Sequence, residues 1–353
     1  MKEASLRLRI VEKRWEAPNT ATFVLEPADD GADLAYEPGQ YLSLALAPHG
    51  KDLRRAYSFS SSPTAGERPA ITVQRVVNGE VSNWLLDHCE QGQYLTSAGV
   101  AGQFLLPDPL PDTLVYLAAG SGITPIISHL KTLLATENSP KILLAFANRD
   151  SRHTIFKAQI DRWIEQYPDR FHCRYFMSRE KGIPNSYFGH LHKSAWEDWL
   201  HEHFGSRISR KQHLNTVFFL CAPFPLMRMA SMSLRVLDFP EKNIRQEIYK
   251  PERTPPARIP DTSRTHTIQV NKDGQHFKFD TYEGETILNA ALRQGIDLPY
   301  TCKAGVCLSC LARCREGAVD LVFAENTRHE GPGSMINTCI GYATSEQVLL
   351  DFE

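Results

Sequence analysis

The 353-residue sequence lacks a long hydrophobic run, and it lacks an excess of charge of either sign. No stretch reaches the roughly 20 apolar residues needed to cross a bilayer, and the charged N-terminal segment contains no apolar stretch of signal-peptide length. We therefore expect a cytoplasmic protein with no membrane-inserted segment. Its 39 basic and 41 acidic side chains nearly cancel, which argues against a protein that binds nucleic acid over its whole surface.

Cysteine is scarce over most of the chain. The first 300 residues contain three cysteines, whereas four fall between Cys302 and Cys314. A secreted disulfide scaffold is short and spreads its cysteines along the chain, so this clustering excludes that class and favours metal binding. The apolar fraction of 42% and the charged fraction of 23% are those of a globular protein. At about 100–200 residues per domain, the length corresponds to two or three domains.

Three segments with different patterns follow one another. Residues 1–110 contain short alternating strands punctuated by glycine and proline, which predicts an antiparallel β-barrel. Residues 111–250 alternate apolar strands with helices, which predicts a doubly wound α/β domain with a parallel sheet. The proline-rich stretch 251–264 is predicted to be a semi-stiff linker, and residues 265–353 an α+β domain with an Asp-Gly hairpin.

The expected elements can be given by their residue ranges. Strands are expected at 5–14, 21–27, 40–46, 70–76, 92–99, 113–120, 141–148, 171–178, 216–222, 244–249 and 346–352, and a hairpin at 266–280. Helices are expected from about Gly79, and at 125–135, 153–167, 225–237 and 285–295, the last ending at Gly295.

The cysteines of the last segment have the spacing of a plant-type [2Fe–2S] site. Three follow the pattern C-x4-C-x2-C and a fourth lies farther along the chain. A zinc site or buried free thiols are the alternatives, but zinc ribbons usually pair two C-x2-C knuckles and only one is present. Cys314 falls outside the spacing and is expected to be a buried thiol. The expected cluster ligands are Cys302, Cys307, Cys310 and Cys339.

The loop between the first two of these cysteines also fits a cluster. Ala304 and Gly305 are small enough for the backbone to approach the inorganic sulfides closely. Backbone N–H groups that point at sulfur help to set the reduction potential of such clusters.

A flavin site is indicated by a polar stretch on or beside an expected barrel strand. An arginine can bind a pyrophosphate with two parallel hydrogen bonds, and a tyrosine offers a flat face for an isoalloxazine ring. A serine hydroxyl can hydrogen-bond flavin N5, and a helix start offers free N–H groups to a phosphate. An ordinary polar strand is the alternative. The candidate flavin residues are Arg55, Tyr57, Ser58, Ser61, Gly79, Val81 and Ser82.

A pyridine-nucleotide site is predicted where the strand at 113–120 ends. Gly120 and Gly122 allow the backbone to approach a pyrophosphate, and the following helix supplies N–H donors. Thr124 is expected to cap that helix, with Pro125 in its first turn. The third glycine of a Rossmann fingerprint is missing, so the motif by itself is weakly specific.

The order of these motifs resembles the ferredoxin–NADP reductase superfamily. EPGQYLSL, RAYSFSS and GEVSNWL are similar to its FAD domain, and the glycine loop with Thr124 and Pro125 is similar to its nucleotide loop. The resemblance implies that the helix start at Gly79 binds the second phosphate, which favours FAD over FMN. The segment from His266 to the end resembles a plant-type ferredoxin domain, although MINTC replaces the usual pattern before the last ligand.

The same resemblance implies the catalytic residues. CAPFPLM is similar to the superfamily's Cys-Gly-Pro-x-x-Met segment, which implies that Cys221 lies beside the nicotinamide, with Ala222 in place of glycine. Glu247 matches a late glutamate near the active site, and a surface carboxylate is its alternative. The candidate catalytic residues are therefore Ser58, Cys221 and Glu247.

Residues after the second and third strands of the α/β segment bear on the choice between NADPH and NADH. Arg149 and Arg179 suit the oxygens of a 2′-phosphate, and Ser178-Arg179-Glu resembles the 2′-phosphate site of NADP-specific relatives. Asp150 and Glu180 would favour NADH, because a carboxylate accepts a hydrogen bond from the ribose hydroxyl. NADPH is the preferred prediction.

The predicted cofactors define an order of electron transfer. NADPH delivers two electrons together, a [2Fe–2S] cluster takes one at a time, and FAD can connect them. The whole chain resembles reductase components of bacterial oxygenases, most closely those of phenylacetyl-CoA epoxidases, which implies a di-iron oxygenase or hydroxylase as electron acceptor. Alternatives are the reductase of another hydroxylase, of a ring dioxygenase or of a desaturase, with NADH as an alternative electron donor.

Two other classes of protein fit the sequence less well. A redox sensor would not need the hydride site formed by Ser58, Cys221 and Glu247. A self-contained oxygenase would need a second metal centre, and no 2-His-1-carboxylate or paired Glu-x-x-His pattern is evident. Residues 265–353 carry twelve acidic and seven basic side chains, which would suit a basic electron acceptor or serve solubility alone.

Shortening the linker at 251–264 is expected to slow cytochrome c reduction and to leave ferricyanide reduction unchanged. The reason is that only the first acceptor would depend on movement of the ferredoxin domain. Steady-state rates with both acceptors provide the measurement, and equal rates in the shortened and full-length proteins would rule the idea out.

Overall fold

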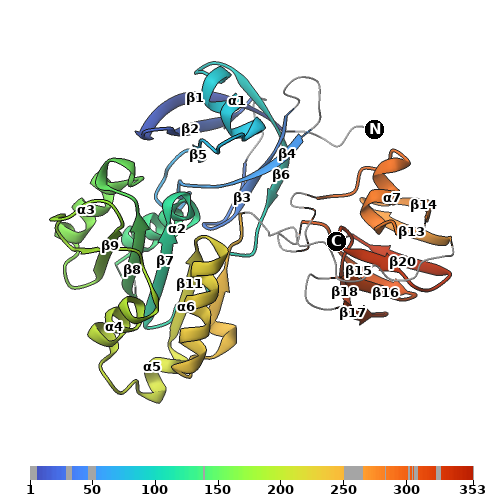
Figure 1. Ribbon diagram of the computed structural model, residues 1–353. Helices are drawn as coiled ribbons and strands as arrows, with labels where there is room; N and C mark the ends of the chain where they lie inside the picture. The colour runs from blue at the N-terminus through green and yellow to red at the C-terminus, as the bar shows by residue number, and fades with distance from the viewer. Residues whose placement is uncertain are drawn as a thin grey trace. The chain divides into compact units, whose positions relative to one another are not determined.

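The computed structural model describes residues 6–28, 34–46, 53–137, 140–249, 265–282, 284–300, 303, 305, 309–322 and 327–352. These residues fall into two compact units, the first made of residues up to Tyr249 and the second of residues that come later in the sequence (Figure 1). The expected linker and the expected ligands Cys302 and Cys307 lie outside the described residues.

An antiparallel barrel begins the first unit. Its six strands are ordered β4-β3-β6-β1-β2-β5, and a bridge between Phe59 and Ile71 joins the two outer strands. In β1 the apolar Leu8 and Ile10 are buried while the arginines between and beside them are exposed, as an alternating strand requires. The elements are β1 (Leu6–Ala17), β2 (Thr20–Pro27), β3 (Tyr41–Leu46), β4 (Leu53–Ser58), β5 (Ala70–Gln74), α1 (Glu80–His88) and β6 (Tyr94–Ala101).

A six-stranded parallel sheet follows, ordered β10-β9-β8-β7-β11-β12. The strands are β7 (Thr113–Ala119), β8 (Lys141–Asn148), β9 (Phe171–Met177), β10 (Ser186–Phe188), β11 (Thr216–Cys221) and β12 (Ile244–Gln246). The helices are α2 (Ile123–Leu134), α3 (Lys157–Gln166), α4 (Lys193–Phe204), α5 (Arg210–Leu214) and α6 (Phe224–Val236), with 3-10 turns at Gly120–Gly122, Ser151–His153 and Glu241–Asn243.

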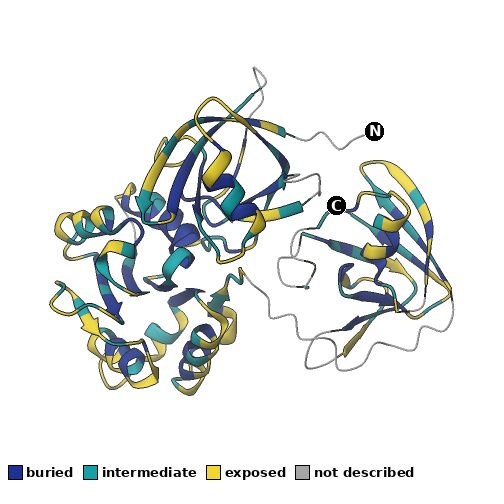
Figure 2. Ribbon diagram, turned by 45° about the horizontal axis from the view of Figure 1, so that its top comes forward, coloured by how far each residue is buried: buried dark blue, intermediate teal, exposed yellow. Residues whose placement is uncertain are grey.

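Alternate residues of the central strand β7 pack on opposite faces of this sheet. Leu114 and Tyr116 contact the apolar side chains of α2 and α3, whereas Val115 and Leu117 contact those of α4 and α6. Figure 2 shows buried strands between helices whose outer faces are exposed. The chain order reverses between β7 and β11, and ligands of such sheets bind at the carboxyl ends of the strands at that point.

The second unit has its own hydrophobic core beneath α7. It contains a five-stranded sheet, ordered β14-β13-β20-β15-β18, and a three-stranded sheet, ordered β17-β16-β19. Asp273 and Gly274 both have positive φ, 51° and 71°, as a two-residue hairpin turn requires. The elements are β13 (His266–Lys272), β14 (Gln275–Thr281), α7 (Ile287–Arg293), β15 (Leu311–Glu316), β16 (Val319–Val322), β17 (Thr327–Glu330), β18 (Met335–Asn337), β19 (Gly341–Ala343) and β20 (Gln347–Asp351).

The architecture confirms the expected fold classes: an antiparallel barrel, a doubly wound α/β sheet and an α+β unit. Three elements of the α/β part, β10, α4 and α5, were not expected from the sequence. The sequence also predicted that Thr124 caps α2, and this is wrong. The cap residue is Gly122, and Thr124 lies inside the first turn. No helix in the described part of the chain is long and apolar enough to cross a membrane.

Candidate functional site

Polar groups from the barrel and from the α/β sheet meet at the carboxyl ends of β7 and β11. The hydroxyl of Tyr249 lies 3.0 Å from Ser58 Oγ and 2.7 Å from Thr124 Oγ1. The buried thiol of Cys221 is a further close neighbour of this hydroxyl. Ser58 is the last residue of β4, Cys221 the last of β11, and Thr124 lies in the first turn of α2. Three residues that are far apart in the sequence therefore surround one phenolic oxygen.

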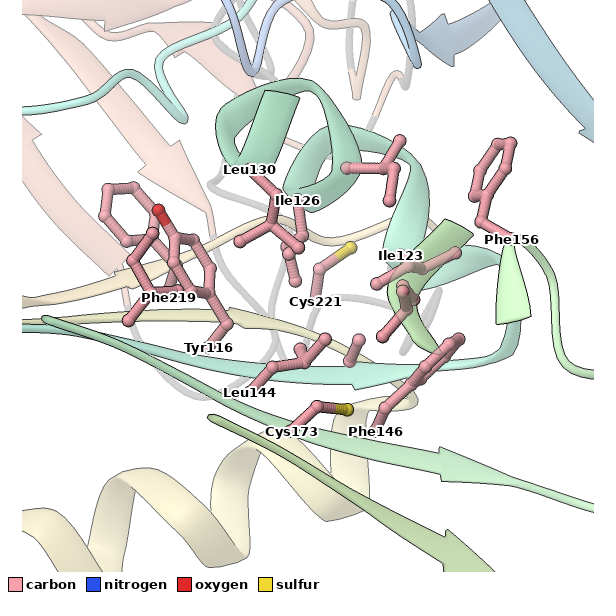
Figure 3. Close-up of a cluster of buried hydrophobic side chains, with 14 of the residues drawn as sticks. Tyr116, Ile123, Ile126, Leu130, Leu144, Phe146, Phe156, Cys173, Phe219 and Cys221 are labelled. Atoms are coloured by element: carbon pink, nitrogen blue, oxygen red, sulfur yellow. The ribbon is translucent and has the colours of Figure 1, made fainter. Parts of the chain in front are cut away.

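Cys221 is enclosed beneath α2. Its side chain is 1% exposed and belongs to the same hydrophobic core as Ile123 and Ile126 of that helix (Figure 3). Burial raises the pKa of the thiol well above its ordinary value, and the neighbouring Glu247 raises it further. The thiol is therefore neutral near pH 7, which excludes a thiolate nucleophile at this position.

Glu247 follows β12 and is held against the same strand end. Its backbone N–H donates to the carbonyl of Leu220 at 3.0 Å. Burial raises the pKa of its carboxyl from 4.5 to about 8, so the group is largely protonated at neutral pH. It is half-buried rather than a solvated surface carboxylate.

The glycine loop between β7 and α2 is shaped by close packing. A Cβ at Gly122 would overlap the carbonyl oxygen of Cys221, so only glycine lets α2 begin against the end of β11. Gly120 has φ +53°, which favours glycine, and a Cβ there would contact only the Gln74 side chain, at 3.8 Å. Instead of capping the helix, Thr124 donates its hydroxyl to the carbonyl of Ser121 at 3.0 Å.

The candidate flavin residues on β4 differ in their surroundings. Arg55 is exposed and donates to the carbonyl of Arg54 at 2.8 Å. Tyr57 is half-buried, and burial raises the pKa of its phenol. Ser61 is turned into the interior, because its hydroxyl bonds Tyr36 Oη at 2.7 Å and accepts from the N–H of Ala70 at 2.7 Å. The geometry thus does not bring Ser61 together with the others.

The start of α1 has the features of a phosphate site. Gly79 is its cap residue and no side chain caps the first N–H groups. A Cβ on Gly79 would lie 2.5 Å from Ser82 Oγ, so the turn accommodates only glycine without rearrangement. Ser82 is buried and accepts from the N–H of Val76 at 3.3 Å, and Val81 is buried in the barrel core.

The residues predicted to select the nucleotide lie side by side at the ends of β8 and β9. The N–H of Arg179 donates to the carbonyl of Arg149 at 2.8 Å, and that of Ser178 donates to Asn148 at 3.1 Å. The two nearby acids already have partners. Asp150 pairs with Arg149 at 3.1 Å, and Glu180 accepts from the N–H of Ser151 at 2.6 Å.

Two of the four expected cluster ligands are described, and both are buried. The N–H of Gly305 donates to Cys339 Sγ at 3.2 Å, and the backbone N–H and hydroxyl of Thr338 donate to the carbonyl of Cys310. Gly305 has φ +74°, and a Cβ there would lie 2.5 Å from Ile340 Cδ1. The tight backbone and the N–H···S contact fit the loop of an iron–sulfur cluster.

Cys314 belongs to the core of the second unit. Its thiol is fully buried on β15 and donates to the carbonyl of Glu316 at 3.4 Å. Burial raises its pKa, which fits the buried thiol that the cysteine spacing predicted. Among the described residues no three potential metal ligands gather, and half of the expected ligand set falls outside them.

Comparison with known protein families gives a match for the barrel, for the α/β region and for the second unit. Residues 7–105 match an oxidoreductase FAD-binding domain, 116–232 an oxidoreductase NAD-binding domain, and 270–344 a 2Fe-2S iron-sulfur cluster binding domain. The chain is 30% identical to the 3-ketosteroid-9-alpha-monooxygenase ferredoxin reductase component of Rhodococcus rhodochrous, over 87% of this chain and 85% of that protein. The chain belongs to the ferredoxin reductase-type reductases of oxygenase systems.

Two further relatives agree with this family. The reductase is 28% identical to one of the subunits of the Escherichia coli 1,2-phenylacetyl-CoA epoxidase, over 99% of this chain and 97% of that one. The solved structure of phthalate dioxygenase reductase shares the fold, with a TM-score of 0.61, 23% identity and coverage of 99% of both chains. The expected superfamily is confirmed: the protein is an oxidoreductase that transfers electrons through FAD and a [2Fe–2S] cluster.

Sequence reasoning missed Tyr249, the residue at the centre of the site. It is the final residue of the strand expected at 244–249, where a tyrosine is ordinarily explained by strand packing. Its hydroxyl is enclosed by Ser58 and Thr124, although 44% of the residue is exposed. Only the meeting of the barrel and the sheet identifies it.

We expect Glu247→Gln to stabilise the protein at about pH 8.5 and to have little effect near pH 5. A carboxyl with a raised folded pKa keeps a proton that the unfolded chain releases, so wild-type stability falls as the pH rises from about 4.5 to about 8. Glutamine cannot ionise and removes that loss, which is at most about 5 kcal/mol for a shift of this size. Thermal unfolding across this range measures it, with exposed Glu241→Gln as the control. Parallel wild-type and Glu247→Gln curves would contradict the assignment.

Proposed function

We propose that the reductase oxidises NADPH at the junction of Ser58 and Thr124 and delivers electrons through its ferredoxin unit to the di-iron component of an oxygenase. One observation carries the proposal. A single hydroxyl, that of Tyr249, spans the distance between the flavin segment and the nucleotide loop, so ligands held by the two segments face each other. Domain boundaries at 1–110, 111–250 and 265–353 are part of the same proposal.

FAD supplies the chemistry of taking two electrons from the nucleotide and releasing them singly to the cluster. Arg55, Tyr57 and Ser58 on β4 would hold it, with the N–H groups of α1 after Gly79 and the hydroxyl of Ser82 on its phosphates. The cradle fits, because Gly79 accommodates no Cβ and the first turn of α1 has no side-chain cap.

The pyridine nucleotide would bind along the loop from Gly120 to Pro125, at the end of β7. Tyr249 lies between Thr124 of this loop and Ser58, so a nicotinamide held between those two residues would have to displace the phenol. The protonated carboxyl of Glu247 and the neutral thiol of Cys221 leave this junction without fixed charge. Both groups can donate hydrogen bonds from there.

Cys310 and Cys339, together with Cys302 and Cys307, would hold the cluster, and Gly305 would direct its N–H to a ligand sulfur. The similarity to a component of the phenylacetyl-CoA epoxidase system supports an epoxidase of phenylacetate catabolism as acceptor. The similar identity to a steroid monooxygenase reductase favours a second candidate, the oxygenase of a steroid-degrading system. Rates of product formation with each purified oxygenase would separate them.

We expect Cys339→Ala to lose cytochrome c reduction by more than about tenfold while ferricyanide reduction with NADPH stays within about twofold. The reason is that ferricyanide takes electrons from the flavin, whereas cytochrome c takes them from the cluster. Cys314→Ala is the matched control, because that thiol lies outside the ligand set. Retained cytochrome c reduction in Cys339→Ala, or no NADPH oxidation in the wild type, would contradict the proposed function.

The nucleotide preference has its own test. The adjacency of Arg149 and Arg179 supports NADPH, since the acids beside them are already paired. We expect Arg179→Gln to raise KM for NADPH about tenfold and to leave KM for NADH unchanged, because one charge-assisted contact to the 2′-phosphate is lost. Exposed Arg162→Gln on α3 serves as the control. A wild-type preference for NADH would overturn the assignment.

A further inference from the structure

One face of α2 is attached to the barrel at several points. Ser128 Oγ donates to the carbonyl of Ser61 at 2.6 Å, and Thr132 Oγ1 lies 2.7 Å from Ser62 Oγ. Lys131 pairs with Glu67 at 3.0 Å. These contacts join the helix to the segment that directly follows β4. The nucleotide loop at the start of α2 is thus tied to the flavin barrel through the body of the helix.

His129 is the most deeply enclosed of these links. It is fully buried, and its Nε2 lies 3.2 Å from the carbonyl oxygen of Pro38 and also faces that of Phe104. Its Nδ1 has no partner in the described part of the chain, so the proton belongs on Nε2. Burial lowers the pKa of the imidazole to about 3, which keeps it a neutral donor.

The barrel is shaped to receive this ring. A Cβ on Gly39 would overlap both the backbone carbonyl of Phe104 and His129 Nε2, so only glycine at this point of the EPGQY segment leaves room for both. The imidazole stacks on the ring of Phe104, with centroids 5.6 Å apart. It also meets the edge of Phe219 from β11, with centroids 4.9 Å apart. Barrel, helix and sheet therefore all contact one side chain.

Rigid elements lead from this ring to both halves of the active site. Toward the nucleotide loop, Thr124 lies five residues earlier on the same helix, a rise of about 7.5 Å. Toward the flavin, Pro38 and Gly39 lead into β3, in which Tyr41 pairs directly with Ser58 of β4. A shift of the imidazole relative to Pro38 would thus alter the separation of Thr124 and Ser58.

We propose that His129 is a positioning residue for electron transfer, which sets the distance between the nucleotide loop and the flavin segment by holding α2 against the barrel. The inference rests on the proposed function, because the distance between the nucleotide loop and the flavin segment matters only if NADPH reduces the flavin there. Small displacements of bound reactants are expensive in rate, and about 1 Å can cost up to a hundredfold. The residue touches neither Ser58 nor Thr124 and acts through the elements between them.

The test uses the full-length, FAD-loaded protein and rapid mixing with NADPH. His129→Phe keeps the ring and removes the donor, and we expect flavin reduction about tenfold slower, with weaker nicotinamide–flavin charge-transfer absorbance. His129→Gln places an amide N–H near the position of Nε2, and we expect it to recover the rate to within about threefold of wild type. FAD content is expected to be unchanged in both variants.

Leu133→Val is the matched control, since Leu133 is buried on the same helix and its aliphatic side chain can form no hydrogen bond to the barrel. We expect it to lower Tm comparably and to leave the rate and the charge-transfer band unchanged. If His129→Phe does not fold, Thr132→Val removes the neighbouring link to Ser62 and is expected to slow flavin reduction in the same direction. Full-rate reduction in the folded His129 variant, or in Thr132→Val if that replaces it, would overturn the inference, as would an equal loss in Leu133→Val.

The two hypotheses fail in different ways. If wild-type protein does not reduce its flavin with NADPH, the proposed function fails and the positioning role falls with it. If wild type reduces its flavin and His129→Phe matches it, the positioning role alone is rejected.

Discussion

The active site depends on the pairing of β7 with β11 and on the close approach that this pairing imposes. The two strands are distant in sequence and parallel in space, so their carboxyl ends lie together. Gly122 then abuts the carbonyl of Cys221, where no side chain fits. This contact places the first turn of α2, with Thr124, beside the end of β11. A larger residue would push the helix away, and the nucleotide loop with it.

Burial rather than charge governs the chemistry of the junction. The pKa values of Cys221, Glu247 and Tyr249 are all raised by burial, so the groups around Ser58 and Thr124 are neutral near pH 7. The cations instead lie at the far end of the proposed nucleotide site, where Arg149 and Arg179 are exposed. The cationic residues that would attract a phosphate are therefore separate from the neutral groups around Ser58 and Thr124.

The two units have independent hydrophobic cores, as separately folded domains require. In the second unit Thr338, between β18 and β19, fixes the carbonyl of Cys310 with its hydroxyl. The first unit combines two modules, and α2 joins them through Ser128, His129 and Thr132. These contacts fix the position of α2 against the barrel.

The sequence by itself determined the modules, their fold classes and the chemistry of the cofactors. Those properties follow from local patterns: strand alternation, glycine turns and the spacing of four cysteines within one segment. Short elements such as β10 and α5 were not predicted, because their residues show no clear hydrophobic periodicity. Thr124 was assigned to a cap since its residue type favours caps, but close packing at Gly122 moved the helix start.

Tertiary structure alone decided which side chains meet. Tyr249 contacts Ser58, which lies 191 residues earlier in the sequence. His129 packs between Pro38, Gly39 and Phe104. Ser61 shows the converse, because its neighbours Tyr36 and Ala70 turn it away from the cofactor segment. Residue type and local spacing contain no information on such contacts, since they depend on how the barrel and the sheet pack against each other.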